Sequence, residues 1–171
     1  MHALQPSAQA QALKQATIIV GSPAGGATDK LARMYADALR GKYAATIVVE
    51  NRPGAGGILA YEYVKNSPAK DGSLTFLSPA YPLAISPHVV KNLPYDTLKD
   101  FTPVAVAARS TMTYVVGPSV PASAGNFTSY LQWLRENPKQ AVYAAQNGSS
   151  QHLLGSILSV SAKLKLENIS Y

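Results

Sequence analysis

Two loops rich in glycine and serine hold the residues of this sequence that could bind a ligand. Residues 23–29 (PAGGATD) lie between a β-branched run and an expected helix, and residues 147–152 (NGSSQH) precede another expected helix. Glycine lets the backbone approach a ligand closely, and the free N–H groups and the dipole at a helix N-terminus favour an anion. We therefore expect both loops to suit an anionic ligand.

Each loop also has a purely structural interpretation. The first loop is then a tight strand-to-helix turn in which Asp29 stabilises the first helical turn. In the second loop, Ser149 or Ser150 is then only the cap of the helix that follows. Nucleotide binding is disfavoured, because neither G-x-G-x-x-G nor G-x-x-x-x-G-K-[ST] occurs in the sequence.

The sequence contains no familiar catalytic arrangement. Its histidines, His2, His88 and His152, lack the H-E-x-x-H spacing, and there is no G-x-S-x-G motif. Asp96 and Asp100 are typical of a solvated surface cluster and not of an acid–base pair. The absence of cysteine excludes a thiol nucleophile and a thiolate metal site. We therefore expect no catalytic residues, no metal and no cofactor, and an enzyme acting on a phosphorylated substrate is the weakest alternative.

The composition favours a globular protein with small acidic partners. The chain has 171 residues, 47% of them apolar and 14% charged, which is enough to bury a core in one domain or two small lobes. Its net charge of +6 comes from single Lys and Arg residues spread along the sequence. Nucleic-acid-binding surfaces usually cluster their basic residues, so we expect no nucleic acid as partner. No apolar run reaches the ~18–20 residues of a membrane span.

The first loop must be positioned by a strand and a helix. A β-branched strand is expected at residues 17–20, and apolar residues at helical spacing predict a helix that starts near Ala27 and ends at Gly41. The apolar face of this helix is expected to consist of Leu31, Met34, Tyr35, Ala38 and Leu39. Because the loop follows a parallel strand, we expect Gly25 and Gly26 at the carboxyl edge of a sheet.

Strand and helix patterns alternate along the rest of the chain. Further strands are expected at residues 46–49, 73–77, 102–108, 113–116, 141–145 and 166–171. Helices are expected at residues 58–66, after a cap at Asn126, and after the second loop. Residues 51–57 (NRPGAGG) should form a turn that feeds a helix, residues 79–94 at most one helical turn, and residues 117–125 a linker. The alternation predicts an α/β fold with parallel strands.

Together these motifs resemble the Bug family of extracytoplasmic solute-binding proteins, the receptors of tripartite tricarboxylate transporters. The matching stretches are collinear over nearly the whole chain from Ile18 on. They are PAGGATDKLAR (23–33), VVENRPGAGG (48–57), KDGSLTFL (70–77), NLPYDTLKDFTPVA (92–105), VVGPSVPA (115–122), ENP (136–138) and NGSSQHLLG (147–155). The sequence departs from the family pattern at Gly21-Ser22, where an aromatic residue and proline are usual, and this difference could alter the ligand chosen.

The resemblance implies a periplasmic binding protein-like α/β fold with two parallel or mixed-sheet lobes that close on a small organic acid. Residues 16–116 would be lobe 1 and residues 117–171 part of lobe 2. From the residues themselves we expect 1–15 to be a disordered tail or the remnant of a signal peptide, because Ala8 to Ala10 match the small-residue A-x-A pattern at the end of one. Family members continue at length after the segment that matches residues 169–171, so we expect the second lobe to be incomplete.

The resemblance also assigns residues that bind the ligand, all of them in or beside the two loops. The first-lobe wall would be formed by Ser22, Ala24, Gly25, Gly26, Ala27, Thr28, Asp29, Ser78 and Pro79. The second-lobe wall would be formed by Asn147, Ser149, Ser150, Gln151 and His152.

The function implied is that of an exported, non-enzymatic periplasmic receptor. It would capture a mono-, di- or tricarboxylate and hand it to the membrane permease subunits of the transporter. The alternative is a truncated or repurposed fragment that binds no solute. With part of one wall missing, we expect affinity of about millimolar at best. We also expect self-association through the incomplete second lobe, because unpaired strand edges and apolar patches favour it.

Overall fold

The computed structural model describes residues 13–170, so Met1–Ala12 of the predicted tail and Tyr171 lie outside the described residues. Leu13–Gln15, which the sequence places in that tail, begin the first strand instead. The chain divides into two compact units, Met1–Pro79 and Ala80–Tyr171. This boundary falls well before residue 117, where the sequence places the change of lobe; the lobe boundary itself stays a prediction.

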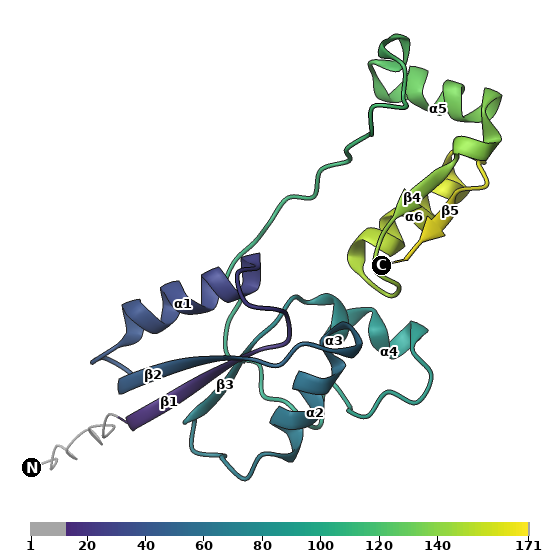
Figure 1. The fold of residues 1–171 in the computed structure, drawn as a ribbon. Coiled ribbons are helices and arrows are strands. Elements are labelled where there is room, and N and C mark those ends of the chain that lie inside the picture. The colour runs from purple at the N-terminus through teal and green to yellow at the C-terminus, as the bar shows by residue number, and fades with distance from the viewer. Residues whose placement is uncertain (1–12, 171) are drawn as a thin grey trace, which may run out of the picture. The chain divides into compact units, whose positions relative to one another are not determined.

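The first unit is a three-stranded parallel sheet with helices between its strands (Figure 1). Its elements in chain order are β1 (Leu13–Val20), α1 (Ala27–Leu39), β2 (Ala44–Asn51), the 3₁₀ turn η1 (Ala55–Gly57), α2 (Ile58–Asn66) and β3 (Leu74–Leu77). The strand order is β2-β1-β3, and Val20 is in register with both Asn51 and Leu77. The carboxyl ends of all three strands therefore lie at one edge of the sheet.

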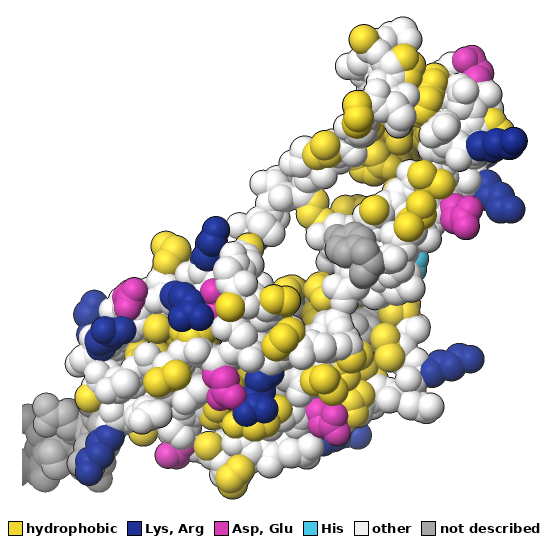
Figure 2. All heavy atoms as spheres, in the orientation of Figure 1, with side chains coloured by type: hydrophobic (Ala, Val, Ile, Leu, Met, Phe, Trp, Pro, Cys, Tyr) yellow, Lys and Arg dark blue, Asp and Glu magenta, His cyan; other side chains and the backbone are white. Residues whose placement is uncertain are grey.

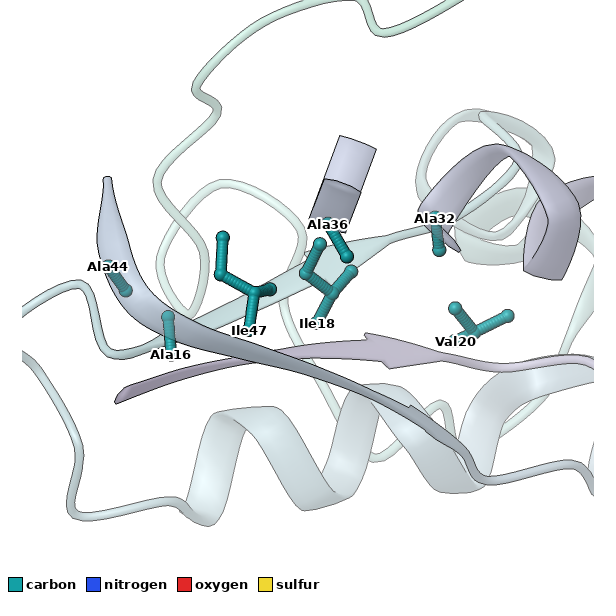
Figure 3. Close-up of a cluster of buried hydrophobic side chains, with 7 residues drawn as sticks. All are labelled: Ala16, Ile18, Val20, Ala32, Ala36, Ala44 and Ile47. Carbon is teal, nitrogen blue, oxygen red and sulfur yellow. The ribbon is translucent and has the colours of Figure 1, made fainter. Parts of the chain in front are cut away.

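The two helices of this unit cover opposite faces of the sheet. Ala32 and Ala36 of α1 pack on Ile18 and Val20 of β1 (Figure 3). Ile19 points to the other face because side chains alternate along a strand. Its partner in the register is Phe76, and the ring of Tyr61 from α2 meets Phe76 edge to face at 4.4 Å.

The predicted apolar face of α1 is partly wrong. Met34 is 68% exposed, and Ala38 and Leu39 are also exposed, whereas Ala32 and Ala36 are buried. Leu31 and Tyr35 are half-buried, and Tyr35 packs against the edge of this core. The alanines face the sheet because a small side chain lets the helix approach closely, and the large residues then point outward.

The second unit holds two single-turn helices, two longer helices and a two-stranded parallel sheet (Figure 1). Its elements are α3 (Tyr81–Ala84), α4 (Ser86–Val89), η2 (Ala122–Ala124), α5 (Phe127–Glu136), η3 (Pro138–Gln140), β4 (Val142–Ala144), α6 (Ser150–Ser161) and β5 (Glu167–Ile169). A small core of Ala124, Tyr130, Leu134 and Ala141 joins α5 to the start of β4. Residues 79–94 thus contain two single-turn helices, one more than expected.

The strands predicted at residues 102–108 and 113–116 are wrong. Residues 101–117 contain neither helix nor strand, and Val104 is 91% exposed. A strand exists only where a second backbone pairs with it, and within residues 13–170 no strand pairs with this segment. Tyr114 does pack its ring against Phe127 and Tyr130 of α5.

Candidate functional site

The first loop lies at the carboxyl edge of the three-stranded sheet, as its sequence predicts. It leaves β1 after Val20 and enters α1 at Ala27, with Gly26 at the N-cap position. Ser78 and Pro79 follow β3 at the same edge, and Asn51 ends β2 there. Parallel α/β sheets bind their ligands outside this edge, so the topology gathers the predicted first-wall residues where a ligand can reach them.

The N-terminus of α1 has no side-chain cap. The helix α2 also lacks a side-chain cap, whereas α5 and α6 are capped. Asn126 accepts a hydrogen bond from Ser129 N–H in α5, and Ser149 accepts one from His152 N–H in α6. The first N–H groups of a helix need an acceptor from outside the helix. At α1 this acceptor can be the carboxylate of a ligand.

The adjacent glycines Gly25 and Gly26 differ in whether the backbone requires glycine. Gly25 has φ +84°, a left-handed conformation that disfavours other residues. Gly26 has an ordinary φ of −71°, and a β-carbon there would meet only Pro23 O, at 3.4 Å. Neither the backbone conformation nor the packing requires glycine at position 26, and its absent side chain leaves the start of α1 open from outside.

Asp29 is buried and its carboxylate is fully engaged inside the protein. Oδ2 accepts hydrogen bonds from Gly25 N–H at 2.9 Å and from Arg33 Nε at 3.0 Å, and Oδ1 accepts one from Arg33 Nη2 at 2.9 Å. The Arg33 hydrogen bond, and after it that of Gly25, lowers the pKa of Asp29 to about 2 against the opposing effect of burial. The side chain of Asp29 thus fixes the loop and faces away from solvent.

Asn51 and Arg33 extend this network, and neither was singled out from the sequence as a site residue. Arg33 Nη2 donates to Asn51 Oδ1 at 3.4 Å, and Asn51 Nδ2 donates to Ser22 O at 3.0 Å. The Ser22 hydroxyl is itself buried without a hydrogen-bond partner. The spacing of Asp29 and Arg33, four residues apart in a helix, was the available indication of their pairing.

Ser78 is held at the end of β3 by the second helix. Tyr61, which is 1% exposed, donates its hydroxyl to Ser78 Oγ at 2.6 Å, and Ser78 Oγ donates to Pro79 O at 3.1 Å. This chain of bonds ties the start of the 78–79 segment to α2. The NRPGAGG turn fits its expected structural role, because Gly57 lies within 3.2 Å of the position that a β-carbon of Gly21 would occupy.

The second loop lies at the carboxyl end of β4, before α6. Ser149, and not Ser150, caps α6 and is itself buried. Gly148 N–H donates to His152 Nδ1 at 3.1 Å, which makes this ring nitrogen an acceptor. The His152 ring also lies nearly parallel to that of Tyr143. Gln151 and Asn147 are exposed and Ser150 is half-buried, so these residues stand at the surface of the loop.

Two polar residues of β5 and its end belong to this second site and were missed from the sequence. Asn168 Nδ2 donates to Asn147 Oδ1 at 2.8 Å and to Ala145 O at 3.1 Å, while its Oδ1 is buried without a partner. Asn147 N–H donates to Ser170 Oγ at 3.3 Å. Because β5 runs parallel to β4, its carboxyl end meets the same loop.

The predicted residues thus form two groups, one in each compact unit. A separate hollow of about 400 Å³ lies on the first unit along α2, lined by Leu59, Glu62, Tyr63, Asn66, Ser67 and Pro68, and it contains none of them. Basic side chains are scattered over the face shown in Figure 2. Over residues 13–170, no acidic and histidine side chains group as metal ligands, and no helix is long and apolar enough to cross a membrane.

The parallel sheets and their loops define the class: an α/β fold of the periplasmic binding protein type. A solved periplasmic transporter protein is similar over 92% of this chain and 52% of that chain, with TM-score 0.73 and 26% identity. The profile of the tripartite tricarboxylate transporter family receptor (TctC) matches residues 31–171. The chain therefore belongs to this family of receptors, as the motifs predict.

Similar proteins of known sequence or structure are consistent with this family. Protein BugT of Bordetella pertussis is 28% identical over 155 residues, which are 90% of this chain and 47% of BugT. R. palustris Rpa4515, solved with adipate, is 29% identical with TM-score 0.77 and covers 92% of this chain and 52% of its own. The chain spans about half the length of the relatives it matches.

Proposed function

We propose that this chain is the ligand-capturing part of a periplasmic receptor for small organic carboxylates, which it passes to the permease subunits of a tripartite tricarboxylate transporter. The family match supports the receptor class. The adipate bound by the R. palustris relative supports a dicarboxylate as ligand. The proposed role is capture and release without catalysis.

The observation that carries the proposal is the uncapped N-terminus of α1 beside Gly26. Its N–H groups and helix dipole favour an anion, and within residues 13–170 the helix start has no side-chain cap. Hydrogen bonds from N–H groups to a charged acceptor are roughly twice as strong as those to a neutral one. In the second loop, the N–H groups of Ser150 and Gln151 in the first turn of α6 can serve a carboxylate in the same way, because the Ser149 cap takes up that of His152.

Titration calorimetry with adipate, malate, acetate and a neutral sugar tests the proposal. We expect the dicarboxylates to bind and the sugar not to bind. Glycine and serine are both good N-cap residues, differing by only about a few tenths of a kcal/mol. Gly26→Ser should therefore keep the fold while its hydroxyl competes for the N–H groups, and carboxylate affinity should fall. A purely structural loop predicts no change in ligand response.

Gly117→Ser is the matched control, because a β-carbon there would meet nothing within 4 Å. It should leave both thermal stability and carboxylate binding unchanged. Binding of sugars or polyamines in preference to all carboxylates would contradict the proposal.

A second candidate is a fragment that associates with itself. It is supported by the apolar side chains that α6 exposes: Leu153 is 44% exposed, Ile157 51% and Val160 79%. These residues follow helical spacing and form one stripe. Light scattering on the sample used for calorimetry separates the two candidates, because a receptor binds carboxylates as a monomer and the fragment forms dimers without doing so.

A further inference from the structure

We propose that Asp29 and Arg33 act as a positioning pair for the first loop: Asp29 fixes the backbone at Gly25, and Arg33 cancels the negative charge that would otherwise repel an anionic ligand. This inference rests on the proposed carboxylate receptor and deepens it. It removes Asp29 from the residues that contact the ligand and assigns the neutralisation of its carboxylate to Arg33, which the sequence did not single out.

The pair ties the first turn of α1 to the loop that precedes it. Asp29 lies in the first turn of α1, and its side chain is 3% exposed. The Arg33 fork holds both carboxylate oxygens, at 3.0 and 2.9 Å, while Gly25 N–H takes the remaining direction on Oδ2 at 2.9 Å. Bidentate pairs of this kind add geometric specificity as well as energy. The pair therefore determines where the backbone of Gly25 lies.

The same guanidinium reaches the other end of the loop. Arg33 Nη2 contacts Asn51 Oδ1, and Asn51 Nδ2 holds the carbonyl of Ser22. Ser22 and Gly25 are thus both tied, through Asn51 and Asp29, to one side chain. Gly26 and the start of α1 follow directly after this fixed segment, and their N–H groups are held in place before a ligand arrives.

Asp29 and Arg33 have separate roles in the charge balance of the loop. A carboxylate near an anion site raises the cost of binding a second negative charge, and like charges within about 4–6 Å disfavour each other's ionised forms. Asp29 is ionised because its pKa is low. Arg33 is half-exposed and lies against it, so the pair has no net charge. Without Arg33, an incoming carboxylate would approach an uncompensated negative charge in the first turn of α1.

The test is a charge series on the 171-residue chain. Arg33→Gln should lower the affinity for adipate, a dianion, by about tenfold or more and the affinity for acetate by less. The reason is that a neighbouring charge commonly changes a carboxyl equilibrium by about 1–3 pKa units. The double variant Asp29→Asn/Arg33→Gln should regain part of the lost adipate affinity, because no charge is left uncompensated. Arg33→Lys should keep the adipate-to-acetate ratio of the native chain.

A merely structural role predicts a different pattern. Adipate and acetate would weaken equally in Arg33→Gln, and the double variant would be at least as poor as the single one. Either result overturns the charge role of Arg33. Hydrogen exchange of the Gly25 amide, measured by NMR, tests the other half: Asp29→Ala removes the acceptor and should accelerate exchange by about tenfold or more, corresponding to a hydrogen bond of about 1.4 kcal/mol.

Failure of the proposed receptor function can be distinguished from failure of the loop-fixing role. If the native chain binds no carboxylate, the receptor proposal fails and the charge role fails with it. Gly25 exchange then decides the loop-fixing role by itself, since it needs no ligand. Unchanged exchange in Asp29→Ala would overturn that role whatever the binding results are.

Discussion

Gly155 of α6 lies directly beneath the ring of Tyr143 in β4, so closely that a β-carbon at position 155 would overlap the ring atoms. The Tyr143 hydroxyl in turn donates to the carbonyl of His152 at 3.3 Å, at the start of the same helix. One aromatic side chain thus holds α6 against the sheet and orients the helix that follows the second loop.

Gly155→Ala should destabilise the second unit. Alanine favours a helix interior by about 1 kcal/mol over glycine, but the overpacking of Tyr143 costs about 1–3 kcal/mol. We expect a net loss of about 1 kcal/mol, measured by urea unfolding. In a Tyr143→Ala background the ring is gone, and the same substitution should instead stabilise the unit. An equal effect in both backgrounds would show that the ring does not limit residue 155.

Ser149→Ala should destabilise α6, and Ser150→Ala should not. Ser149 Oγ accepts the His152 N–H at 3.2 Å, and loss of such a cap costs about 1 kcal/mol. Ser150 is the first residue within the helix and serves as the matched control. Thermal unfolding by circular dichroism compares the two variants. If the two serines contribute equally, the cap is assigned to the wrong residue.

Most of the first unit could be predicted from local patterns. The predicted helix at residues 58–66 has these bounds in the structure, because Gly57 precedes it and Pro68 follows it. The helix after the first loop begins at Ala27, as predicted, directly after Gly26. The inward face of α1 could not be predicted in the same way. It depends on which side chains fit against Ile18 and Val20. The prediction chose the larger apolar side chains, whereas alanines make the contact.

The other differences between prediction and structure depend on pairing between segments that are distant in sequence. The valines near residue 104 have strand propensity, but a strand also needs a neighbouring backbone. In the candidate site, the position of Asn168 depends on the parallel pairing of β4 and β5, whose registered residues, such as Tyr143 and Asn168, are 25 positions apart. Both loops were foreseen because their glycines, serines and following helices are adjacent in sequence.

The stability of the first unit should depend on the charge of Asp29 at acid pH. Its folded pKa of about 2 lies below the ordinary value of 3.8. The ionised carboxylate therefore stabilises the fold fully above about pH 4, and this contribution is lost as the pH falls toward 2. Asp29→Asn should be less stable at neutral pH and should lose less stability between pH 4 and 2, followed by urea unfolding across that range.

The control for the acid series is Asp37→Asn on the outer face of the same helix. Both side chains of the Asp37–Arg40 pair are exposed, and such pairs contribute about 0–1 kcal/mol to the free energy of unfolding. This variant should keep the acid dependence of the native chain. Equal slopes for Asp29→Asn and the native chain would mean that Asp29 does not titrate within the folded network.

Self-association, if it occurs, should depend on the exposed stripe of α6. Ile157 and Val160 lie three residues apart on the solvent side of the helix, away from the second loop, and exposed apolar patches favour association. Ile157→Lys places a charge in the centre of the stripe. It should raise the dissociation constant of a dimer by about tenfold or more, since burying an unpaired charge costs more than 1.4 kcal/mol.

Sedimentation velocity over a range of protein concentrations measures this effect. Met34→Lys is the matched control, because Met34 is a large apolar residue that is 68% exposed on α1 in the other unit. It should leave the dissociation constant unchanged if α6 forms the contact. Equal weakening by both variants would indicate nonspecific association through exposed apolar surface. A native chain that stays monomeric at all concentrations, and binds adipate with micromolar affinity, would contradict both the association and the expected millimolar limit.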